Sequence, residues 1–251
     1  MAGHSHWARI KRQKGAADAK RGRMFSKLAR AIISAARQGG GDPGANLKLR
    51  YAIEEARAEN MPKDSIERAL RRGTGQEEGS NFEEVTYEGY GRGGVAVLVE
   101  ALTDNRHRTG PELKKIFERH GGNLGASGSV AWMFDRKAIF GVATGGIAED
   151  RLLEVGLEAG AEDLEAVEGG GFLLRADPSA HHAVKEALER AEIPVESSEI
   201  SYLPKTTVTI DASIARSVLN LMHELEESED VQKAHANFEI PASVLEEIGE
   251  T

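Results

Sequence analysis

The sequence predicts an α+β protein of three domains: an N-terminal three-helix bundle and two ferredoxin-like α+β domains, the third inserted in the second. Apolar residues recur at helical spacing up to about residue 72, and strand-like alternation replaces that spacing after residue 80. Residues 138–203 then have the order strand, helix, strand, strand, helix, strand, which is the ferredoxin-like arrangement. We expect a basic arm and bundle in 1–75, an α+β domain in 80–135 plus 205–251, and the inserted domain in 136–204.

Three helices are expected in the bundle. The first, over 16–38, carries an apolar stripe at three- and four-residue spacing: Phe25, Leu28, Ala29, Ile32 and Ala36. A glycine-rich run ends it, and Asn46 is a suitable N-cap for a second helix. A third, short helix opens at residues 61–62 and is expected to end at Gly73 as its C-terminal cap.

The first helix is also expected to present a basic face to solvent. At 100° per residue, five cations fall within about a third of a turn on the side opposite the apolar stripe: Lys20, Arg23, Lys27, Arg30 and Arg37.

The second domain begins with expected strands at 85–90 and 95–102. A helix at 109–120 follows, with Thr109 and Glu112 as a capping box. Alternation then predicts a strand at 129–134, with one face formed by Val130, Trp132 and Phe134.

The chain after the inserted domain is expected to return to the second domain. Its predicted elements are a strand at 206–210, a helix at 213–227 and a strand at 231–238. Together they would complete a split βαβ unit that starts in 95–134.

Charge is distributed unevenly along the chain. The net charge is −9, but residues 1–75 contain 17 Lys and Arg against 7 Asp and Glu, whereas the rest of the chain contains 15 Lys and Arg against 34 Asp and Glu. A basic segment joined to an acidic one is typical of a module that binds polyanions, although a solvated basic face is the alternative. The absence of cysteine excludes disulfides, thiolate zinc sites and cysteine nucleophiles. No signal-peptide core or membrane-length apolar run is found, so we expect a cytoplasmic protein.

The N-terminal arm concentrates residues suited to nucleic acid: His4, His6, Trp7, Arg9, Lys11, Arg12 and Lys14. Cations neutralise phosphates and an exposed tryptophan can stack on a base, which suits RNA better than a duplex groove. The alternative is that Trp7 packs on the bundle. His4 and His6 could bind copper or nickel through a free amino terminus, but we expect no metal site.

A second polar region, residues 103–108, is expected to lead into a helix. Arg106 and Arg108 could hold a phosphate backbone there, beside the glycine-rich loop at 121–128. Turn chemistry with incidental charge is the alternative for that loop.

Enzyme signatures are missing from the sequence. Two G-x-G-x-x-G matches, at 39–44 and 89–94, do not follow a strand and open a helix, and neither a P-loop nor a G-x-S-x-G motif is found. One acidic cluster is interpreted as a solvated helix end: Glu224, Glu226, Glu227, Glu229 and Asp230. We expect no catalytic residues, no cofactor and no small-molecule substrate.

Long motifs resemble one known family. They are MAGHSHW, DAKRGRMFSKLAR, ENMPKDSIERALRRGTG, YEGYGRGGVAVLVEALTDNRHRT, HGGNLGASGSVAWMF and DVQKAHANFEI. Together they resemble the YebC family of bacterial regulators, related to mitochondrial translational activators of cytochrome oxidase subunit I. The resemblance implies three domains and a nucleic-acid surface at His4, Trp7, Lys11, Arg12, Lys14, Lys20, Arg21, Arg23 and Lys27. Family members often carry Lys where this chain has His6, so a phosphate contact at that position is not implied.

Two functions follow as expectations. The first is a DNA-binding transcriptional regulator that uses the basic arm and helical domain. The alternative is a translation factor whose arm contacts ribosomal RNA and whose acidic domains suit a protein partner. The short third helix is not a convincing recognition helix, which favours RNA. The target sequence, the protein partners and the oligomeric state are left open.

Overall fold

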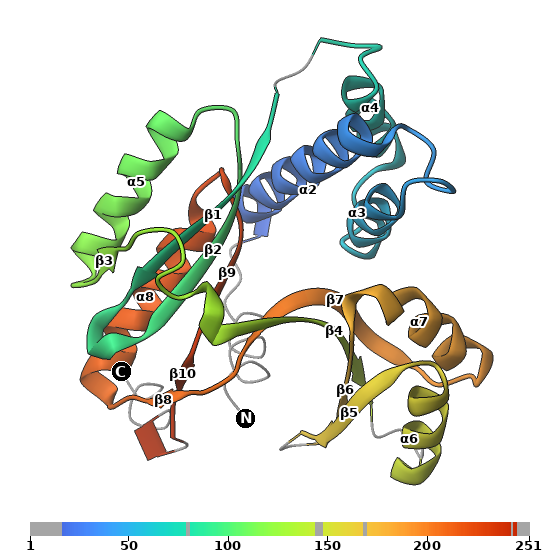
Figure 1. Cartoon of the computed structure of the whole chain (residues 1–251). Helices are drawn as coiled ribbons and strands as arrows, with labels where there is room; N and C mark the ends of the chain where they lie inside the picture. Colours follow the sequence, from blue (N-terminus) through green and yellow to red (C-terminus); the bar gives the residue numbers. More distant parts are fainter. Residues whose placement is uncertain (1–16, 79–80, 144–147, 168–169, 242, 245–251) are drawn as a thin grey trace. The chain divides into compact units, whose positions relative to one another are not determined.

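The computed structural model describes residues 17–78, 81–143, 148–167, 170–241 and 243–244. By their contacts the described residues form two compact units. The bundle-and-sheet unit contains residues up to 131 together with 210–236, and the inserted unit contains 132–209 with 237–239. The α+β class is confirmed (Figure 1). The boundaries of the three expected domains stay a prediction.

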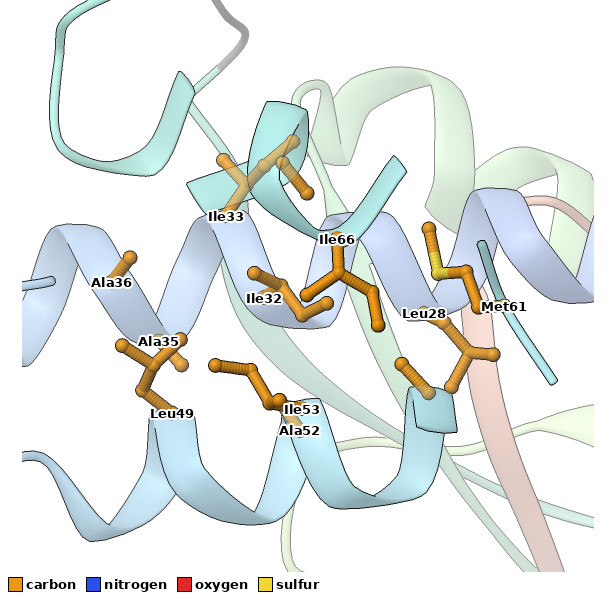
Figure 2. Packing of buried hydrophobic residues seen from close by; sticks show 12 residues of the cluster. Leu28, Ile32, Ile33, Ala35, Ala36, Leu49, Ala52, Ile53, Met61 and Ile66 are labelled. Atoms are coloured by element: carbon orange, nitrogen blue, oxygen red, sulfur yellow. The ribbon is translucent and has the colours of Figure 1, made fainter. Parts of the chain in front are cut away.

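Three helices form the N-terminal part of the bundle-and-sheet unit: α2 (Ala17–Gly39), α3 (Leu47–Ala58) and α4 (Lys63–Gly73). Ile66 of α4 and Ile53 of α3 both point toward α2, where Ile32 is fully buried (Figure 2). The apolar stripe predicted for α2 is confirmed, with Phe25 and Ala29 only partly buried.

Asn46 is the N-cap of α3, as its position predicts. Its Oδ1 accepts a hydrogen bond from the Leu49 N–H at 3.1 Å. Its Nδ2 donates to the Ala35 and Gly40 carbonyls, each at 2.8 Å. One side chain therefore caps α3 and also satisfies carbonyls near the end of α2.

The end of α4 differs from the prediction. Gly73 is the last helical residue and Thr74 is the C-cap, while Gly75 has the positive φ of 77° that a glycine tolerates. Gly73 is needed for close packing instead, because a Cβ there would lie 2.6 Å from Ala36 Cβ and 2.8 Å from the Ile33 carbonyl oxygen.

A four-stranded antiparallel sheet completes this unit, in the order β3-β1-β2-β9. Its elements are β1 (Glu83–Tyr90), η1 (Arg92–Gly94), β2 (Ala96–Thr103), α5 (Arg106–Arg119), β3 (Asn123–Leu124), α8 (Ala212–Glu227) and β9 (Val231–Ala236). Helix α5 lies tight on β1, since a Cβ at Gly89 would lie 2.7 Å from the Phe117 ring. Phe117 and Leu113 of α5 are fully buried, as are Leu221 and Leu225 of α8.

Two predicted features of this unit are wrong. Helix α5 begins one turn early, with Asn105 as N-cap, and Thr109 is a buried residue inside the helix rather than part of a capping box. The predicted strand at 129–134 is a loop followed by a 3₁₀ turn, η2 (Ala131–Met133), because the N–H groups of Val130 and Ala131 donate to a carboxylate instead of to a neighbouring strand. Val130 and Phe134 are buried as predicted, whereas Trp132 is 65% exposed.

The inserted unit has the predicted ferredoxin-like order. Its elements are β4 (Phe134–Val142), α6 (Glu149–Glu158), β5 (Ala161–Ala166), β6 (Phe172–Ala176), η3 (Pro178–Ala180), α7 (His181–Arg190) and β7 (Val195–Pro204). The antiparallel sheet has the order β5-β6-β4-β7, and its core includes Phe140, Leu152 and Leu188. The strand expected at 206–210 is reduced to β8 (Val208–Thr209), which pairs in parallel with β10 (Phe238–Glu239).

Replacing Gly73 by alanine should destabilise the protein by about 1–3 kcal/mol, because the added methyl group overpacks the contact between α4 and α2. Gly22→Ala is the matched control, since Gly22 lies in the same bundle with no atom within 4 Å of its would-be Cβ. It should stabilise the helix by about 0.5–1 kcal/mol. Thermal and denaturant unfolding measure both, and equal effects of the two substitutions would contradict the packing role of Gly73.

Candidate nucleic-acid interface

Part of the predicted nucleic-acid surface lies outside the described residues. This part comprises His4, Trp7, Arg9, Lys11, Arg12 and Lys14, with His6 beside them. Lys20 is within α2, but its side chain is also outside the described part. The described part of the predicted surface therefore consists of α2 from Arg21 onward and the start of α5.

The basic face of α2 is exposed at Arg37, as predicted, but is partly covered along its middle. Three of its cations contact an acidic turn formed by residues 226–230, which links α8 to β9. Arg23 pairs with the Glu227 carboxylate and Lys27 donates to the Glu226 carbonyl. Arg30 donates to Asp230 Oδ1 at 2.6 Å and stacks over the Phe82 ring at 5.3 Å, which leaves its side chain only 18% exposed.

Asp230 lies at the centre of this contact, and its side chain is 4% exposed. While Oδ1 accepts from Arg30, Oδ2 accepts from Arg108 at 2.7 Å and from Thr109 Oγ1 at 2.6 Å. Its backbone carbonyl also accepts the N–H of Leu102 at the end of β2. Asp230 thus ties together α2, α5 and the end of β2.

Electrostatics explains why this buried carboxylate keeps its charge. Burial alone would raise the pKa of Asp230, but hydrogen bonds from Arg108, Thr109 and Arg30 outweigh burial and hold that pKa below its ordinary value. The carboxylate in turn occupies two of the cations that were predicted to bind phosphate, Arg30 and Arg108.

The remaining predicted cations are more accessible. Arg21 is exposed, and Arg37 is exposed with Asn81 as a partner. Arg106 is 58% exposed and pairs with Glu83 at 2.6 Å. Arg108 is 43% exposed, with Asp104 as a second partner at 3.0 Å. The structure therefore brings Arg30 and Arg108 together on Asp230 and leaves Arg21 and Arg106 outside that contact.

The acidic cluster at the end of α8 is a docking segment rather than the predicted solvated helix end. Besides the contacts with α2, Glu224 pairs with Arg119 and accepts a hydrogen bond from His120 Nε2 at 2.7 Å. Burial alone would raise the pKa of Glu224, but the hydrogen bond from His120 and the charge of Arg119 lower it. Local sequence patterns do not predict these pairs, because each joins residues about a hundred or more positions apart.

The glycine-rich loop at 121–128 is held by a residue that sequence reasoning missed. Glu88 of β1 is buried, and its carboxylate accepts three backbone N–H bonds, from Gly128 and Val130 at 2.6 Å and from Ala131 at 2.7 Å. Burial alone would raise the pKa of Glu88, yet the three donors lower it. Because Glu88 uses these donors, they are not available to a phosphate.

Helix α4 carries further exposed cations that were not among the predicted site residues: Arg68, Arg71 and Arg72. Arg71 donates to Glu77 at 2.7 Å, whereas Arg72 approaches Glu77 only to 3.9 Å. The four-residue spacing of Arg68 and Arg72 places both on one face of α4, and this spacing is the sequence signal that indicates a basic face there.

The described ranges lack two kinds of feature. Among those residues, no group of three or more His, Cys, Asp or Glu side chains is arranged to hold a metal ion. Within the same ranges, no helix combines the length and apolar character required to cross a membrane.

Replacing Asp230 by alanine should destabilise the protein by about 3 kcal/mol. This value is at the lower end of the range for breaking a buried ion pair, because water can still reach Arg108 once the carboxylate is removed. Glu229→Ala removes a neighbouring carboxylate that is 73% exposed, so it should cost no more than about 1 kcal/mol. Denaturant unfolding compares the two variants. Equal losses would mean that Asp230 does not anchor α2 and α5.

Replacing Glu88 by glutamine should destabilise the protein by about 1–3 kcal/mol at neutral pH, because an amide cannot accept three N–H bonds in the same way. The lowered pKa of Glu88 means that its contribution is present above its unfolded pKa and is lost as pH falls through the folded pKa. The difference between the two proteins should thus shrink below about pH 4.

Urea unfolding of both proteins between pH 7 and pH 3 measures this difference. Glu112→Gln on the exposed side of α5 is the control for loss of one carboxylate. A constant difference between wild type and Glu88→Gln over this range would contradict the role of the ionised carboxylate.

Comparison with known proteins covers nearly the whole chain. Residues 5–76 match the family described as the TACO1/YebC protein N-terminal domain, and residues 82–238 match the TACO1/YebC second and third domain. A protein of Rubrobacter xylanophilus named probable transcriptional regulatory protein is 51% identical over 249 residues, which is 99% of each chain. A protein of Geobacter sulfurreducens with the same description is 49% identical over 99% of this chain and all of that one.

A solved structure shares the fold. The crystal structure of a conserved hypothetical protein from Aquifex aeolicus superimposes with a TM-score of 0.82 at 49% identity, covering 94% of this chain and 97% of the other. The predicted resemblance is confirmed by these matches. The chain belongs to the TACO1/YebC family.

Proposed function

We propose that this protein is a DNA-binding transcriptional regulator whose basic N-terminal arm and helical domain bind the nucleic acid. The observation that carries the proposal is the segregation of charge, with an excess of ten cations in residues 1–75 and an excess of nineteen anions in the rest. Such a distribution attracts a polyanion to one end of the chain and repels it from the other. The names of the relatives, probable transcriptional regulatory protein, support a regulatory role.

The contacts of α2 refine which residues we assign to phosphate binding. Arg23, Lys27 and Arg30 already have acidic or carbonyl partners in the turn at 226–230, so phosphate would have to compete for them. We assign the principal contacts to the arm cations Arg9, Lys11, Arg12 and Lys14, together with Lys20, Arg21 and Arg106. The proposal includes no catalytic residue and no cofactor, and it places the protein in the cytoplasm.

A second candidate is a translation factor that binds ribosomal RNA. The first two turns of α4 favour it, because they expose Asp64 and Glu67 at the end where a recognition helix contacts bases. These carboxylates offset the exposed Lys63 and Arg68, so the two turns offer no net positive charge to the phosphates beside a major groove. Structured RNA, which is bound through loops and unpaired bases, does not require an inserted helix.

Replacing Arg9, Lys11, Arg12 and Lys14 together by glutamine should weaken binding to a DNA duplex and make it less sensitive to salt. Four fewer phosphate contacts reduce the slope of log K against log salt by roughly 3.6. The control replaces four cations of the inserted unit by glutamine: Arg151, Lys185, Arg190 and Lys205. Fluorescence anisotropy over a salt series measures both. Equal slopes for the variant and wild type would remove the arm from the proposed interface.

Association in cells separates the two candidates. Under the transcriptional proposal, cross-linking to DNA should give reproducible promoter enrichment that is lost when residues 1–14 are deleted. Co-sedimentation with ribosomes at the same salt, also lost on that deletion and without DNA enrichment, would make the protein a translation factor instead.

A further inference from the structure

The bundle contains a groove that the assigned interface does not use. It runs between α2 and α4, with Phe25 and Ile33 contributed by α2 and Met61 by the turn before α4. Its volume is about 200 Å³. Pockets for drug-sized ligands are larger, roughly 300–1,000 Å³, so this groove has room for a single planar ring rather than a whole ligand.

One wall of the groove is basic. Arg68 and Arg72 lie one turn apart on α4, both line the groove and both are exposed. In the part of the chain that the structure describes, Arg68 has no ion pair, and Arg72 only approaches Glu77, whose carboxylate is held by Arg71. This wall therefore differs from the α2 face, where Arg23 and Arg30 are already paired with acidic residues.

Two hydroxyl groups complete the polar lining. Ser26 of α2 donates to the Gly22 carbonyl, which leaves its oxygen able to accept. Ser65 of α4 also lines the groove, and among the described residues its hydroxyl has no hydrogen-bond partner. These three components suit the parts of a nucleotide. The apolar floor can hold the base, the hydroxyl groups can bind the polar edge of the base or the sugar, and the two neighbouring guanidinium groups can bind the phosphate.

We propose that this groove binds one unpaired nucleotide of a single-stranded nucleic acid, with the base on Phe25 and Met61 and the adjoining phosphate on Arg68 and Arg72. This inference rests on the proposed nucleic-acid function and specifies the form of nucleic acid. A duplex offers the same phosphates, but its bases are stacked and paired and cannot enter a groove of this size. An acidic peptide could satisfy the arginines, but it has no need of the two hydroxyl groups that line the groove.

Replacement of Arg68 and Arg72 by glutamine in the full-length protein tests the phosphate contacts. The probes are a 12-nucleotide oligouridylate, the corresponding oligothymidylate and a 12-base-pair DNA duplex. Two fewer contacts to a single strand reduce the salt slope by about 1.4, which corresponds to roughly 25-fold weaker binding near 0.1 M salt. The matched control, Arg151→Gln with Arg190→Gln, makes the same change of charge on exposed helices of the inserted unit.

Methyl NMR tests the base contact separately. The chain has five methionines, so ¹³C-methyl labelling gives a simple spectrum in which Met61→Leu assigns the groove signal. Either single-stranded probe should shift the Met61 signal, and the duplex should not. Met222, which is buried in α8, provides the internal reference. A shift with both single strands defines a site for unpaired bases of either sugar, while a shift with one alone assigns the site to RNA or to DNA.

Failure of this inference can be distinguished from failure of the proposed function. Binding of single strands that is unchanged in the Arg68 and Arg72 variant, with no shift of Met61, would overturn the groove site and leave nucleic-acid binding intact. A Met61 shift caused by a polyglutamate peptide but not by oligonucleotides would also overturn it. No binding of any of the three nucleic acids by the wild-type protein would overturn both.

Discussion

The carboxylate of Asp230 is the constraint on which the bundle-and-sheet unit depends. It receives Arg30 from α2, Arg108 and Thr109 from α5, and its own backbone accepts from the end of β2. A buried charge is stable only when its partners are fixed in place, so the ion pairs and the apolar core restrict each other's geometry. The acidic turn is therefore part of the fold, although its composition is typical of a solvated loop.

This arrangement divides the cations of the bundle into two classes. Arg23, Lys27 and Arg30 are occupied by the chain itself, whereas Arg21, Arg68 and Arg72 lie on surfaces that the acidic turn does not reach. A count of positive charge over residues 1–75 cannot separate the classes. Only the second class can neutralise a bound phosphate without first losing a contact with the acidic turn, and the same distinction applies to any charge-based search for a nucleic-acid surface.

Local sequence patterns predicted the parts of the fold that depend on local chemistry. Asn46 is an N-cap because its side chain reaches Leu49 three residues on, and the strand-helix order of the inserted unit follows from periodicity alone. Patterns failed where a distant partner decides the structure. Thr109 fits a capping box in sequence, but its hydroxyl donates to Asp230 and the residue is buried inside α5. The alternation at Val130 and Trp132 does not give a strand, because the Val130 N–H donates to Glu88, some forty residues earlier. The residues of the candidate site were predicted least accurately, because the exposure of a cation depends on such distant partners.

The long sequence separation between α2 and the acidic turn affects how the protein emerges during its synthesis. Arg30 and Asp230 are 200 residues apart, which at about 5–20 residues per second corresponds to roughly 10–40 s of translation. Throughout this interval α2 is outside or leaving the ribosome while its carboxylate partners do not yet exist. The nascent bundle therefore carries its full positive charge beside a surface rich in RNA, and it becomes partly neutral only when the last strand of its sheet has been made.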